Sequence, residues 1–501
     1  MNLANHVARI AKRSPEQVAI RFEGVSVSYR TLDRCANRLA ANLAQRGIGK
    51  GDRVALYLPN IPAFALAYLA VLRIGAIAVS INAIFKADEV RYILNDAGAL
   101  AVFTTAELLP NLPFDQCPAV RHTIIVEGHA EKQQSLEAWL AGAATRFRAC
   151  VMQPDDVAAI LYSSGTTGVP KGVMLTHVNI ESNTLTAAKY SNMQPSDRLA
   201  VFLPLFHVFA QNYIMNGAFQ RGSTLVLFRR FIPDPVLAGI ASERVSMFFA
   251  VPTIFIALMN LPDIEAKLAS VRYWFSAAAT MPQEISRRWH ERFGRPIFEG
   301  YGLTECAPFA AYNHLKQHRF GSVGTAVEDF AIKIVDEQDQ EVAQGQWGEI
   351  VIRGPGVMKG YWGKPADTAH ALRGGWLHSG DIGTMDDEGF VFIVDRVKDM
   401  INVSGFKVWP AEVENVLYQH PAIKELAVFG APHPEKGESV RAAIVLRDGA
   451  SVTPADIISY CRSKMAVYKA PEQVEIVTEL PKSATGKILK RVLRERASSA
   501  P

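Results

Sequence analysis

The sequence predicts an α/β protein with a large N-terminal domain that contains a small β-rich unit, followed by a smaller C-terminal α+β domain. Strand-like and helix-like stretches alternate along most of the first 390 residues, and such alternation is typical of largely parallel sheets. Near residue 330 the pattern changes to short strands separated by Gly turns. A charged link at residues 395–399 then precedes about a hundred residues, which are enough to fold as a separate domain.

The N-terminal domain begins with a predicted hairpin over residues 17–29, which turns at Glu23-Gly24, and an amphipathic helix over residues 31–45. A strand, a helix and another strand follow, at residues 53–58, 63–72 and 76–81. The middle helix lies in the most apolar stretch of the chain, residues 61–72. Because about twenty apolar residues are needed to cross a bilayer, we expect a buried helix here and no transmembrane segment.

A second alternating series begins at residue 156. We expect a strand to Tyr162, a Gly-rich loop, a helix from His177, a strand over residues 199–202 and a helix over residues 208–219. The β-rich unit, at about residues 320–394, has short predicted strands at residues 332–335, 348–353 and 390–394.

The remaining segment has the pattern of a compact α+β domain. We expect a helix over residues 410–418, strands near Leu426 and Ala442, a helix from Pro454 and a basic C-terminal helix. The expected division is therefore residues 1–397 and residues 398–501.

Composition and charge exclude several classes of protein. The 53 Lys and Arg residues against 49 Asp and Glu give a formal charge of +4, and this excess is spread along the chain, which argues against nucleic-acid binding. Apolar residues make up 49% of the chain, too many for intrinsic disorder. The five cysteines are odd in number and lack CxxC spacing. From these cysteines we expect no disulfide framework or zinc site and a cytoplasmic location. We also expect no secretory signal.

A polar, Gly-rich loop over residues 162–172 is the first chemical signal. Its three glycines let the backbone approach an anion, and its four Ser and Thr hydroxyls and Lys171 supply hydrogen-bond donors. A predicted strand precedes it, and α/β proteins bind ligands at the carboxyl ends of strands. The loop is not a Walker A motif, because Gly follows Lys171. A flexible surface loop would be the other interpretation, but turns seldom concentrate so many donors and glycines.

Five further motifs follow this loop in order. They are LPLFH at residues 203–207, YGLTE at 301–305, HSGD at 378–381, DRVK at 395–398 and PKSATGK at 481–487. With these motifs the chain resembles, over essentially its whole length, the acyl-adenylate-forming superfamily of acyl-CoA synthetases, peptide-synthetase adenylation domains and beetle luciferases. The resemblance implies that a carboxylic acid is activated with ATP as acyl-AMP, with release of pyrophosphate, and that the acyl group is then transferred to coenzyme A.

The resemblance also implies roles for individual residues. Catalytic roles fall on Lys487, Thr304, Glu305 and His207, with Glu305 holding Mg²⁺ and Thr304 contacting the α-phosphate. For ATP binding it implies Ser163, Ser164, Gly165, Thr166, Thr167, Gly168, Lys171, Ala277, Ala278, Gly300, Tyr301, Gly302, Thr304, Asp381 and Arg396. For the acyl pocket it implies Phe206, His207, Val251, Ala277 and Gly302. Gly405 and Phe406 would admit the pantetheine arm of coenzyme A, and Lys398 would be the hinge of a mobile C-terminal domain. The family usually has glycine where Ala277 stands.

The sequence says less about which carboxylic acid and which thiol the protein uses than about the reaction. Amino-acid-activating members of the superfamily place an aspartate in the region after LPLFH, and no acidic residue occurs here between Arg198 and Asp234, so the resemblance disfavours an α-amino acid substrate. The apolar and small residues Phe206, Phe209, Ile214, Val251 and Ala277 to Ala279 indicate an apolar tail, fatty or aromatic, and favour a medium or long chain. The alternatives are a ligase that loads an acyl carrier protein, a benzoate- or cinnamate-like aryl acid CoA ligase, a luciferase-like oxidase and a nucleotide-binding module without chemistry. The oligomeric state is not indicated.

Overall fold

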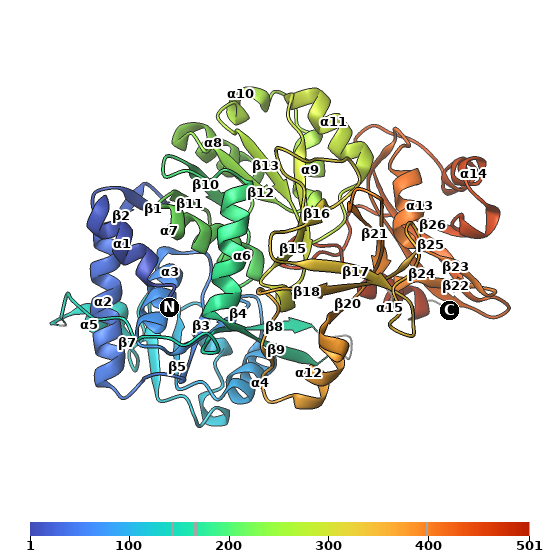
Figure 1. Ribbon diagram of the computed structural model, residues 1–501. Helices are drawn as coiled ribbons and strands as arrows, with labels where there is room; N and C mark the ends of the chain where they lie inside the picture. Colours follow the sequence, from blue (N-terminus) through green and yellow to red (C-terminus); the bar gives the residue numbers. More distant parts are fainter. Residues whose placement is uncertain (143, 165–168, 397–398, 500–501) are drawn as a thin grey trace.

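The computed structural model describes residues 1–142, 144–164, 169–396 and 399–499 (Figure 1). The chain forms a mixed α/β structure with a large N-terminal domain and a smaller C-terminal domain, as the sequence predicts. The C-terminal domain, coloured orange to red, lies at the right of Figure 1, beside the strands of the β-rich unit.

One large sheet of the N-terminal domain has a parallel centre. In spatial order its strands are β19 (Gly360–Tyr361), β9 (Pro170–Thr176), β8 (Val157–Ser164), β4 (Ile77–Ile81), β3 (Arg53–Tyr57), β5 (Ala101–Thr104), β6 (His122–Ile125) and β7 (Gln134–Ser135). Neighbours from β8 to β7 are parallel, whereas β9 and β19 are antiparallel. Every residue of β4 is buried, as expected of a central parallel strand that is covered on both faces.

A second large sheet carries most of the remaining strands of this domain. Its order is β16 (Thr325–Ala326), β15 (Phe309–Tyr312), β14 (Ile297–Gly302), β13 (Tyr273–Ser276), β12 (Met247–Ala250), β10 (Arg198–Val201), β11 (Thr224–Leu227), β1 (Val18–Phe22) and β2 (Val25–Ser28). The strands from β14 to β1 are parallel, so their carboxyl ends meet at one edge of the sheet. The predicted hairpin of β1 and β2 is confirmed.

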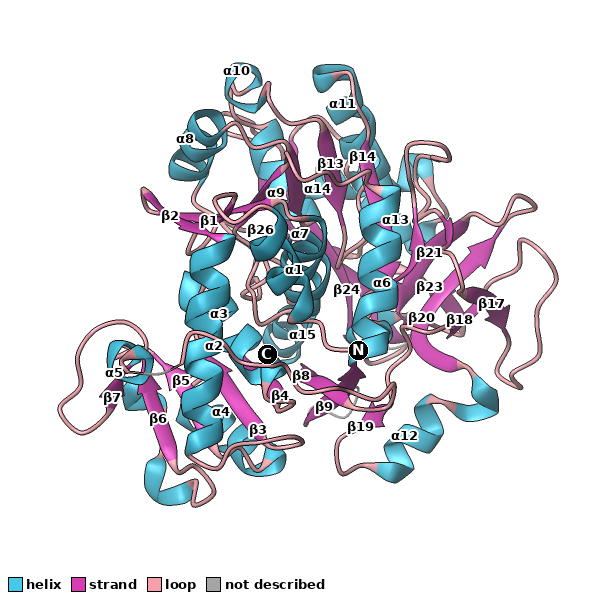
Figure 2. Cartoon of the chain, turned by 60° about the vertical axis from the view of Figure 1, so that its left-hand side comes forward, coloured by secondary structure: helices cyan, strands magenta, loops and turns pink. Residues whose placement is uncertain are grey.

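Helices cover these sheets (Figure 2). Those of the N-terminal domain are α1 (Asn5–Arg13), α2 (Tyr29–Gln45), α3 (Pro62–Arg73), α4 (Ala87–Ala97), α5 (Leu136–Leu140), α6 (His177–Tyr190), α7 (Gly217–Arg221), α8 (Pro233–Glu243), α9 (Pro252–Met259), α10 (Glu265–Leu268), α11 (Gln283–Phe293) and α12 (Pro365–Ala371). Short 3₁₀ turns span Leu109–Asn111, Phe114–Gln116, Thr304–Cys306 and Arg373–Gly375. Helix α3 is buried over Phe64 to Arg73, which confirms the predicted buried helix.

The β-rich unit and the C-terminal domain each have their own sheet. The β-rich unit contains β17 (Ala331–Val335), β18 (Gly348–Arg353), β20 (Leu377–Met385) and β21 (Val391–Arg396), all antiparallel. The C-terminal sheet contains β23 (Phe406–Val408), β22 (Ile401–Val403), β25 (Gly437–Leu446), β24 (Ile423–His433) and β26 (Gln473–Ile476). Its helices are α13 (Pro410–Leu417), α14 (Pro454–Lys464), the 3₁₀ turn Val467–Lys469 and α15 (Lys490–Ser499).

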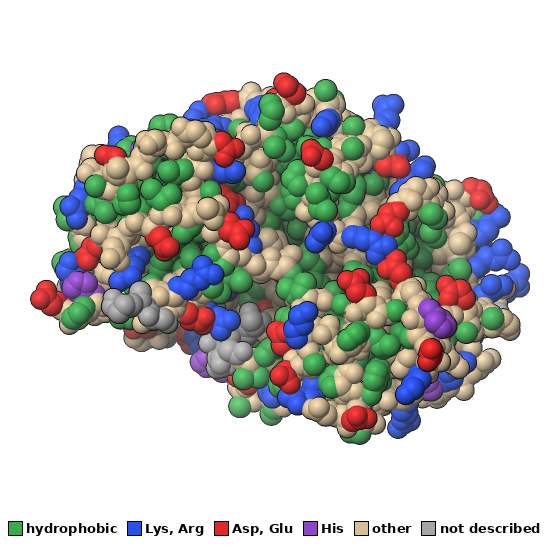
Figure 3. Space-filling view, turned by 180° about the vertical axis from the view of Figure 1, so that it is seen from behind, with side chains coloured by type: hydrophobic (Ala, Val, Ile, Leu, Met, Phe, Trp, Pro, Cys, Tyr) green, Lys and Arg blue, Asp and Glu red, His purple; other side chains and the backbone are tan. Residues whose placement is uncertain are grey.

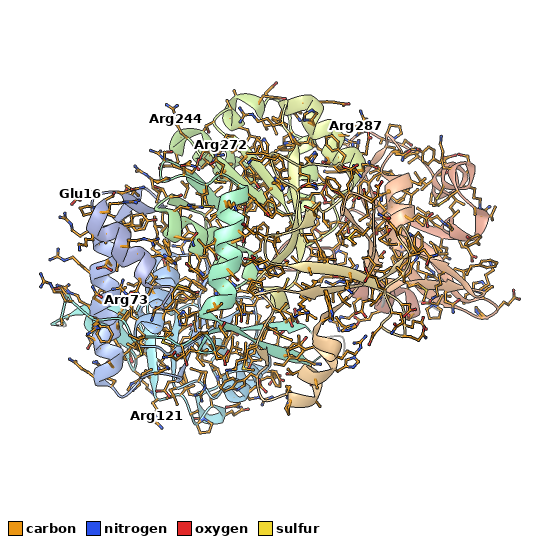
Figure 4. The ribbon with its side chains drawn as sticks, viewed as in Figure 1. Glu16, Arg73, Arg121, Arg244, Arg272 and Arg287 are labelled. Carbon is orange, nitrogen blue, oxygen red and sulfur yellow. The ribbon has the colours of Figure 1, made fainter. Side chains whose placement is uncertain are left out.

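A buried carboxylate links the amino ends of the second sheet. Asp197, just before β10, accepts a 2.7 Å hydrogen bond from Ser246 before β12 and pairs with Arg272 before β13, at 2.5 Å. Arg272 is labelled above the centre of Figure 4. These contacts fix the spacing of three neighbouring strands at the edge opposite their carboxyl ends.

Lys, Arg, Asp and Glu side chains are interspersed over most of the face in Figure 3, and several Lys and Arg side chains gather at its right-hand edge. Within the described residues, no helix combines the length and apolarity that a bilayer crossing needs. All five cysteines are free.

Two parts of the sequence prediction needed revision. The segment predicted as one helix over residues 208–219 forms a π-helix, Phe209–Asn216, that continues into α7. Strands β9 and β20 have no counterpart in the prediction, because β9 follows the Gly-rich loop directly and β20 contains Ser379-Gly380-Asp381, a sequence typical of a turn.

Candidate active site

Four of the residues predicted to line the acyl pocket are brought together by the parallel strands of the second sheet. His207 follows β10, Val251 follows β12, Ala277 follows β13, and Gly302 ends β14. These four strands are neighbours in the order β14, β13, β12, β10, so residues far apart in sequence converge at one edge. This is the edge at which α/β proteins bind ligands.

The backbone around this edge is tightly fitted. A Cβ atom added at Gly302 would lie 1.8 Å from the carbonyl oxygen of Pro308, so that position requires glycine. Ala278 adopts the left-handed conformation with φ of 73°, which costs an ordinary residue about 1–2 kcal/mol. The strained position is thus Ala278 and not its neighbour Ala277, at which the family usually has glycine.

A buried carboxylate joins the two large sheets. Glu305 lies in the 3₁₀ turn after β14, and its Oε1 accepts 3.1 Å hydrogen bonds from the hydroxyls of Ser163, at the end of β8, and Tyr361, in β19. Glu305 is 8% exposed. Glu305 therefore contacts the end of the strand that leads into the Gly-rich loop, and Thr304 precedes it in the same 3₁₀ turn.

Lys171, on the other side of that loop, has an acidic partner. Its ammonium pairs with Asp367 of α12 and lies 5.3 Å from the centre of the Tyr361 ring. The side chain of Lys171 is 14% exposed. Lys171 and Glu305 therefore both lie next to Tyr361. The Asp367 carboxylate holds the Lys171 ammonium, and an anionic ligand could take its place.

Tyr301, Asp381 and Arg396 form a second group on the other face of β14. The Tyr301 hydroxyl donates a 2.8 Å hydrogen bond to Oδ2 of Asp381, and Nε of Arg396 lies 3.1 Å from Oδ1 of Asp381. Burial lowers the pKa of Arg396, but Asp381, Tyr301 and Glu305 outweigh it and raise that pKa. The Arg396 guanidinium therefore remains positively charged near the carboxylates of Asp381 and Glu305.

The loop that carries Lys487 reaches the same edge from the C-terminal domain. The Thr253 hydroxyl in the first turn of α9 donates a 2.9 Å hydrogen bond to the carbonyl oxygen of Gly486. Burial, together with the nearby charge of Lys487, lowers the pKa of His207 to about 4. His207 is therefore neutral near pH 7, and its Nδ1 accepts a hydrogen bond from the backbone of Phe209, at 3.3 Å.

Some predicted positions lie elsewhere. Gly405 lies in the turn between β22 and β23, at the far right of Figure 1, and Phe406 begins β23, where it is 56% exposed and its ring lies 4.8 Å from that of Tyr468. Phe206 is half-buried and packs against the core. Gly165, Thr166, Thr167, Gly168 and Lys398 lie outside the described residues, and Ser164 is described only as the last residue of β8.

Sequence reasoning missed three residues that shape the site: Tyr361, Asp367 and Thr253. Tyr361 and Asp367 lie more than fifty residues after Glu305, in a two-residue strand and an ordinary helix, and Thr253 follows a helix-start proline. No local pattern distinguishes them, because their importance comes from contacts with segments that are distant in sequence.

Comparisons with known proteins show which family the chain matches. Residues 7–362 match the family described as AMP-binding enzyme, and residues 412–487 match the AMP-binding enzyme C-terminal domain. The chain is 35% identical to a long-chain-fatty-acid–CoA ligase of Bacillus subtilis (strain 168), over 97% of this chain and 92% of that protein. It is 35% identical to a feruloyl-CoA synthase of Amycolatopsis sp., over 99% of each. The crystal structure of the anthranilate CoA ligase AuaEII with anthranoyl-AMP superposes with a TM-score of 0.94, at 29% identity, over 99% of this chain and 97% of that one.

Proposed function

We propose, from the premise that this chain belongs to the AMP-binding enzyme family, that it activates a carboxylic acid with ATP and transfers the acyl group to coenzyme A. It is an AMP-forming acid–thiol ligase. The observation that carries this proposal is the approach of the Lys487 loop, from the C-terminal domain, to the strand ends that precede Val251 and His207.

The first half-reaction joins two anions. A carboxylate oxygen of the acid attacks the α-phosphorus of ATP, the bond to the bridging oxygen breaks, and pyrophosphate leaves. Negative charge builds up on the phosphoryl oxygens, so cations and oriented donors lower the barrier. In our proposal Lys487 contacts both the attacking carboxylate and the α-phosphate, and Thr304 donates to the α-phosphate.

In the second half-reaction the pantetheine sulfur of coenzyme A attacks the acyl carbon, and AMP leaves. We assign the entry of this thiol to Gly405 and Phe406, and a rotation of the C-terminal domain to the hinge at Lys398. The exposed position of Phe406 in the present arrangement is consistent with a surface that turns toward the site after adenylation.

The remaining nucleotide contacts are assigned by resemblance to the family. We assign the ribose hydroxyls to Asp381, which has acceptor oxygens near Arg396, the adenine ring to Tyr301, and the outer phosphates to the loop from Ser163 to Lys171. The buried carboxylate of Glu305, surrounded by hydroxyl oxygens, fits Mg²⁺, which prefers oxygen ligands and takes one or two carboxylates besides phosphate oxygens. Bound there, Mg²⁺ would neutralise phosphate charge.

The acid is a fatty or an aryl acid, since both kinds of ligase are among the similar proteins. A carrier-protein thiol remains the alternative to free coenzyme A. A cytoplasmic location is part of the proposal, consistent with five free cysteines.

The test is release of pyrophosphate and AMP from ATP with a panel of fatty and aryl acids, with and without coenzyme A. Sustained turnover that requires both an acid and free coenzyme A supports the proposal. Acyl-adenylate that accumulates until a carrier protein is added would favour the carrier-protein alternative, and no product with any acid would refute both.

A further inference from the structure

The aromatic residues behind His207 bear on which acid the enzyme accepts. We propose that Phe209, Tyr213, Phe249, Phe275 and Phe309, here called the ring cluster, close the acyl pocket and restrict the substrate to compact carboxylic acids with one ring or a short chain. This inference rests on the proposed acyl-CoA ligase function and narrows its substrate class, in place of the medium or long chain that the small and apolar pocket residues favoured in the sequence.

The ring cluster lies directly behind the pocket positions. Phe249 and Phe275 precede Val251 and Ala277 by two residues, and residues two apart on a strand project from the same face. Phe209 is two residues beyond His207, and its backbone N–H donates to the His207 ring. An acyl tail that passed His207 toward the interior would therefore meet these rings first.

The rings contact one another closely. Phe209 lies 5.8 Å from Phe275 and 5.5 Å from Phe309, and Phe275 lies 5.3 Å from Phe309, all in edge-to-face geometry. Phe249 lies 5.2 Å from Tyr213 in the same geometry. Such centroid distances are those of aromatic rings in direct contact, so an alkyl chain cannot pass between these pairs. Each of these side chains is at most 3% exposed.

The rings also rest on the backbone of β14. A Cβ atom at Gly300 would lie 2.5 Å from Cζ of Phe275 and 3.1 Å from Cδ1 of Phe309. The glycine therefore provides the space that these two rings occupy. Because Gly300 is two residues before Gly302 on the same face of the strand, the rings close the region beside the pocket position Gly302.

Buried hydroxyl groups hold the far side of the ring cluster in place. The Tyr213 hydroxyl is hydrogen-bonded to that of Tyr312, and Tyr273 and Tyr312 share a further hydrogen bond of 2.6 Å. All three residues are buried. A movement of Tyr213 that opened a tunnel would break a hydrogen bond away from water, which is costly. The closed arrangement is therefore rigid, and a flat ring can make edge-to-face contacts with it.

The test compares acids of increasing length by acid-dependent ATP–pyrophosphate exchange, which needs no thiol. For the parent enzyme we expect kcat/KM for benzoate or hexanoate to exceed that for palmitate by at least about a hundredfold, since single methylene groups already give about 10–200-fold discrimination. Phe249→Leu should raise the ratio of decanoate to benzoate by about tenfold.

A matched control is available on the same strand. Phe248 is equally buried in β12 but faces the opposite way, against Phe202, Phe255 and Trp274. Phe248→Leu removes the same ring without touching the ring cluster, and we expect the decanoate-to-benzoate ratio to stay within about twofold of the parent. If Phe249→Leu does not fold, Phe309→Leu provides the second test.

The outcomes separate this inference from the proposed function. Palmitate turned over as well as benzoate and hexanoate would overturn the inference and leave the proposed function intact. Equal shifts of the ratio in Phe249→Leu and Phe248→Leu would overturn the role of the ring cluster. Absence of exchange with every acid would refute the proposed function itself, and the inference with it.

Discussion

The hydroxyl of Thr253 donates a 2.9 Å hydrogen bond to the carbonyl oxygen of Gly486. Thr253 lies in the first turn of α9 in the N-terminal domain, whereas Gly486 immediately precedes Lys487 in the C-terminal domain. Gly486 has φ of 84°, and a Cβ atom there would lie 3.1 Å from Val251. A glycine and a hydroxyl thus hold the Lys487 loop against the strand ends that carry the acyl-pocket residues.

Thr253→Val tests this contact, because valine keeps the shape of threonine but cannot donate the hydrogen bond. Loss of one such bond costs about 1 kcal/mol, and we expect adenylation to slow by about fivefold. Formation of the thioester from preformed acyl-adenylate should change less. The two half-reactions are measured separately, with Thr253→Ser as the control that restores the donor. Equal losses in both half-reactions, or none in Thr253→Val, would contradict the role of this contact.

Gly302→Ala tests the fit of the strand end. The added Cβ would lie 1.8 Å from the Pro308 carbonyl oxygen, so the backbone must shift, and overpacking of this kind costs about 1–3 kcal/mol. We expect a lower melting temperature and loss of most adenylation activity. Gly49→Ala is the control, because nothing lies within 4 Å of a Cβ there. A Gly302→Ala enzyme with parental stability and activity would rule out the close fit.

Glu305→Gln tests the proposed magnesium site. The amide keeps the size of the side chain but removes its charge, and we expect adenylation to fall by about 10²-fold or more and the Mg²⁺ concentration for half-maximal rate to rise. Tyr361→Phe, which removes one hydrogen bond to the Glu305 carboxylate, should have a smaller effect on both quantities. An unchanged Mg²⁺ dependence in Glu305→Gln would place the ion elsewhere.

Glu299 makes the stability of the protein depend on pH. Burial raises the pKa of this β14 side chain to about 8 from 4.5. Between pH 4.5 and pH 8 the folded protein keeps a proton on Glu299 that the unfolded chain has released. The contribution of Glu299 to the free energy of unfolding is therefore complete below pH 4.5 and is lost as the pH rises through 8. Within this pH range the free energy of unfolding falls by up to about 1.4 kcal/mol per pH unit.

Glu299→Gln should remove this dependence, because the amide stays neutral at every pH. Free energies of unfolding from urea titrations at pH 5, 7 and 9 measure it. We expect the difference between variant and parent to move in favour of the variant as the pH rises. Parallel pH profiles for the two proteins would mean that Glu299 is not protonated in the folded state at neutral pH.

The sequence predicted those helices and strands in which buried apolar residues recur at regular spacing. The hairpin of β1 and β2, the buried helix α3 and the alternation that builds the parallel sheets were all predictable, because each depends on neighbouring residues. Strand β20 was not, since the turn-like residues around Gly380 are accommodated in a strand by contacts with β18 and β21. Tertiary pairing there outweighs local propensity.

The site was predictable to the extent that its chemistry lies in compact motifs. Glu305 and Lys487 were predicted as site residues from the motifs around them, but the residues that contact them in the fold were not. Ser163 and Tyr361 reach Glu305 from strands of the other large sheet. The ring cluster likewise arises from a helix and three strands whose order only the folded sheet reveals.

The most direct test of the proposed chemistry is the rate of ATP–pyrophosphate exchange in Lys487→Ala, measured with the best acid of the parent enzyme. Lys482→Ala is the matched control, because Lys482 lies in the same loop but pairs with Glu425 of the C-terminal domain, at 2.8 Å. Our account predicts a fall of about 10²–10³-fold for Lys487→Ala, with unfolding free energy within about 0.5 kcal/mol of the parent, and near-parental exchange for Lys482→Ala. Parental exchange in Lys487→Ala would contradict it.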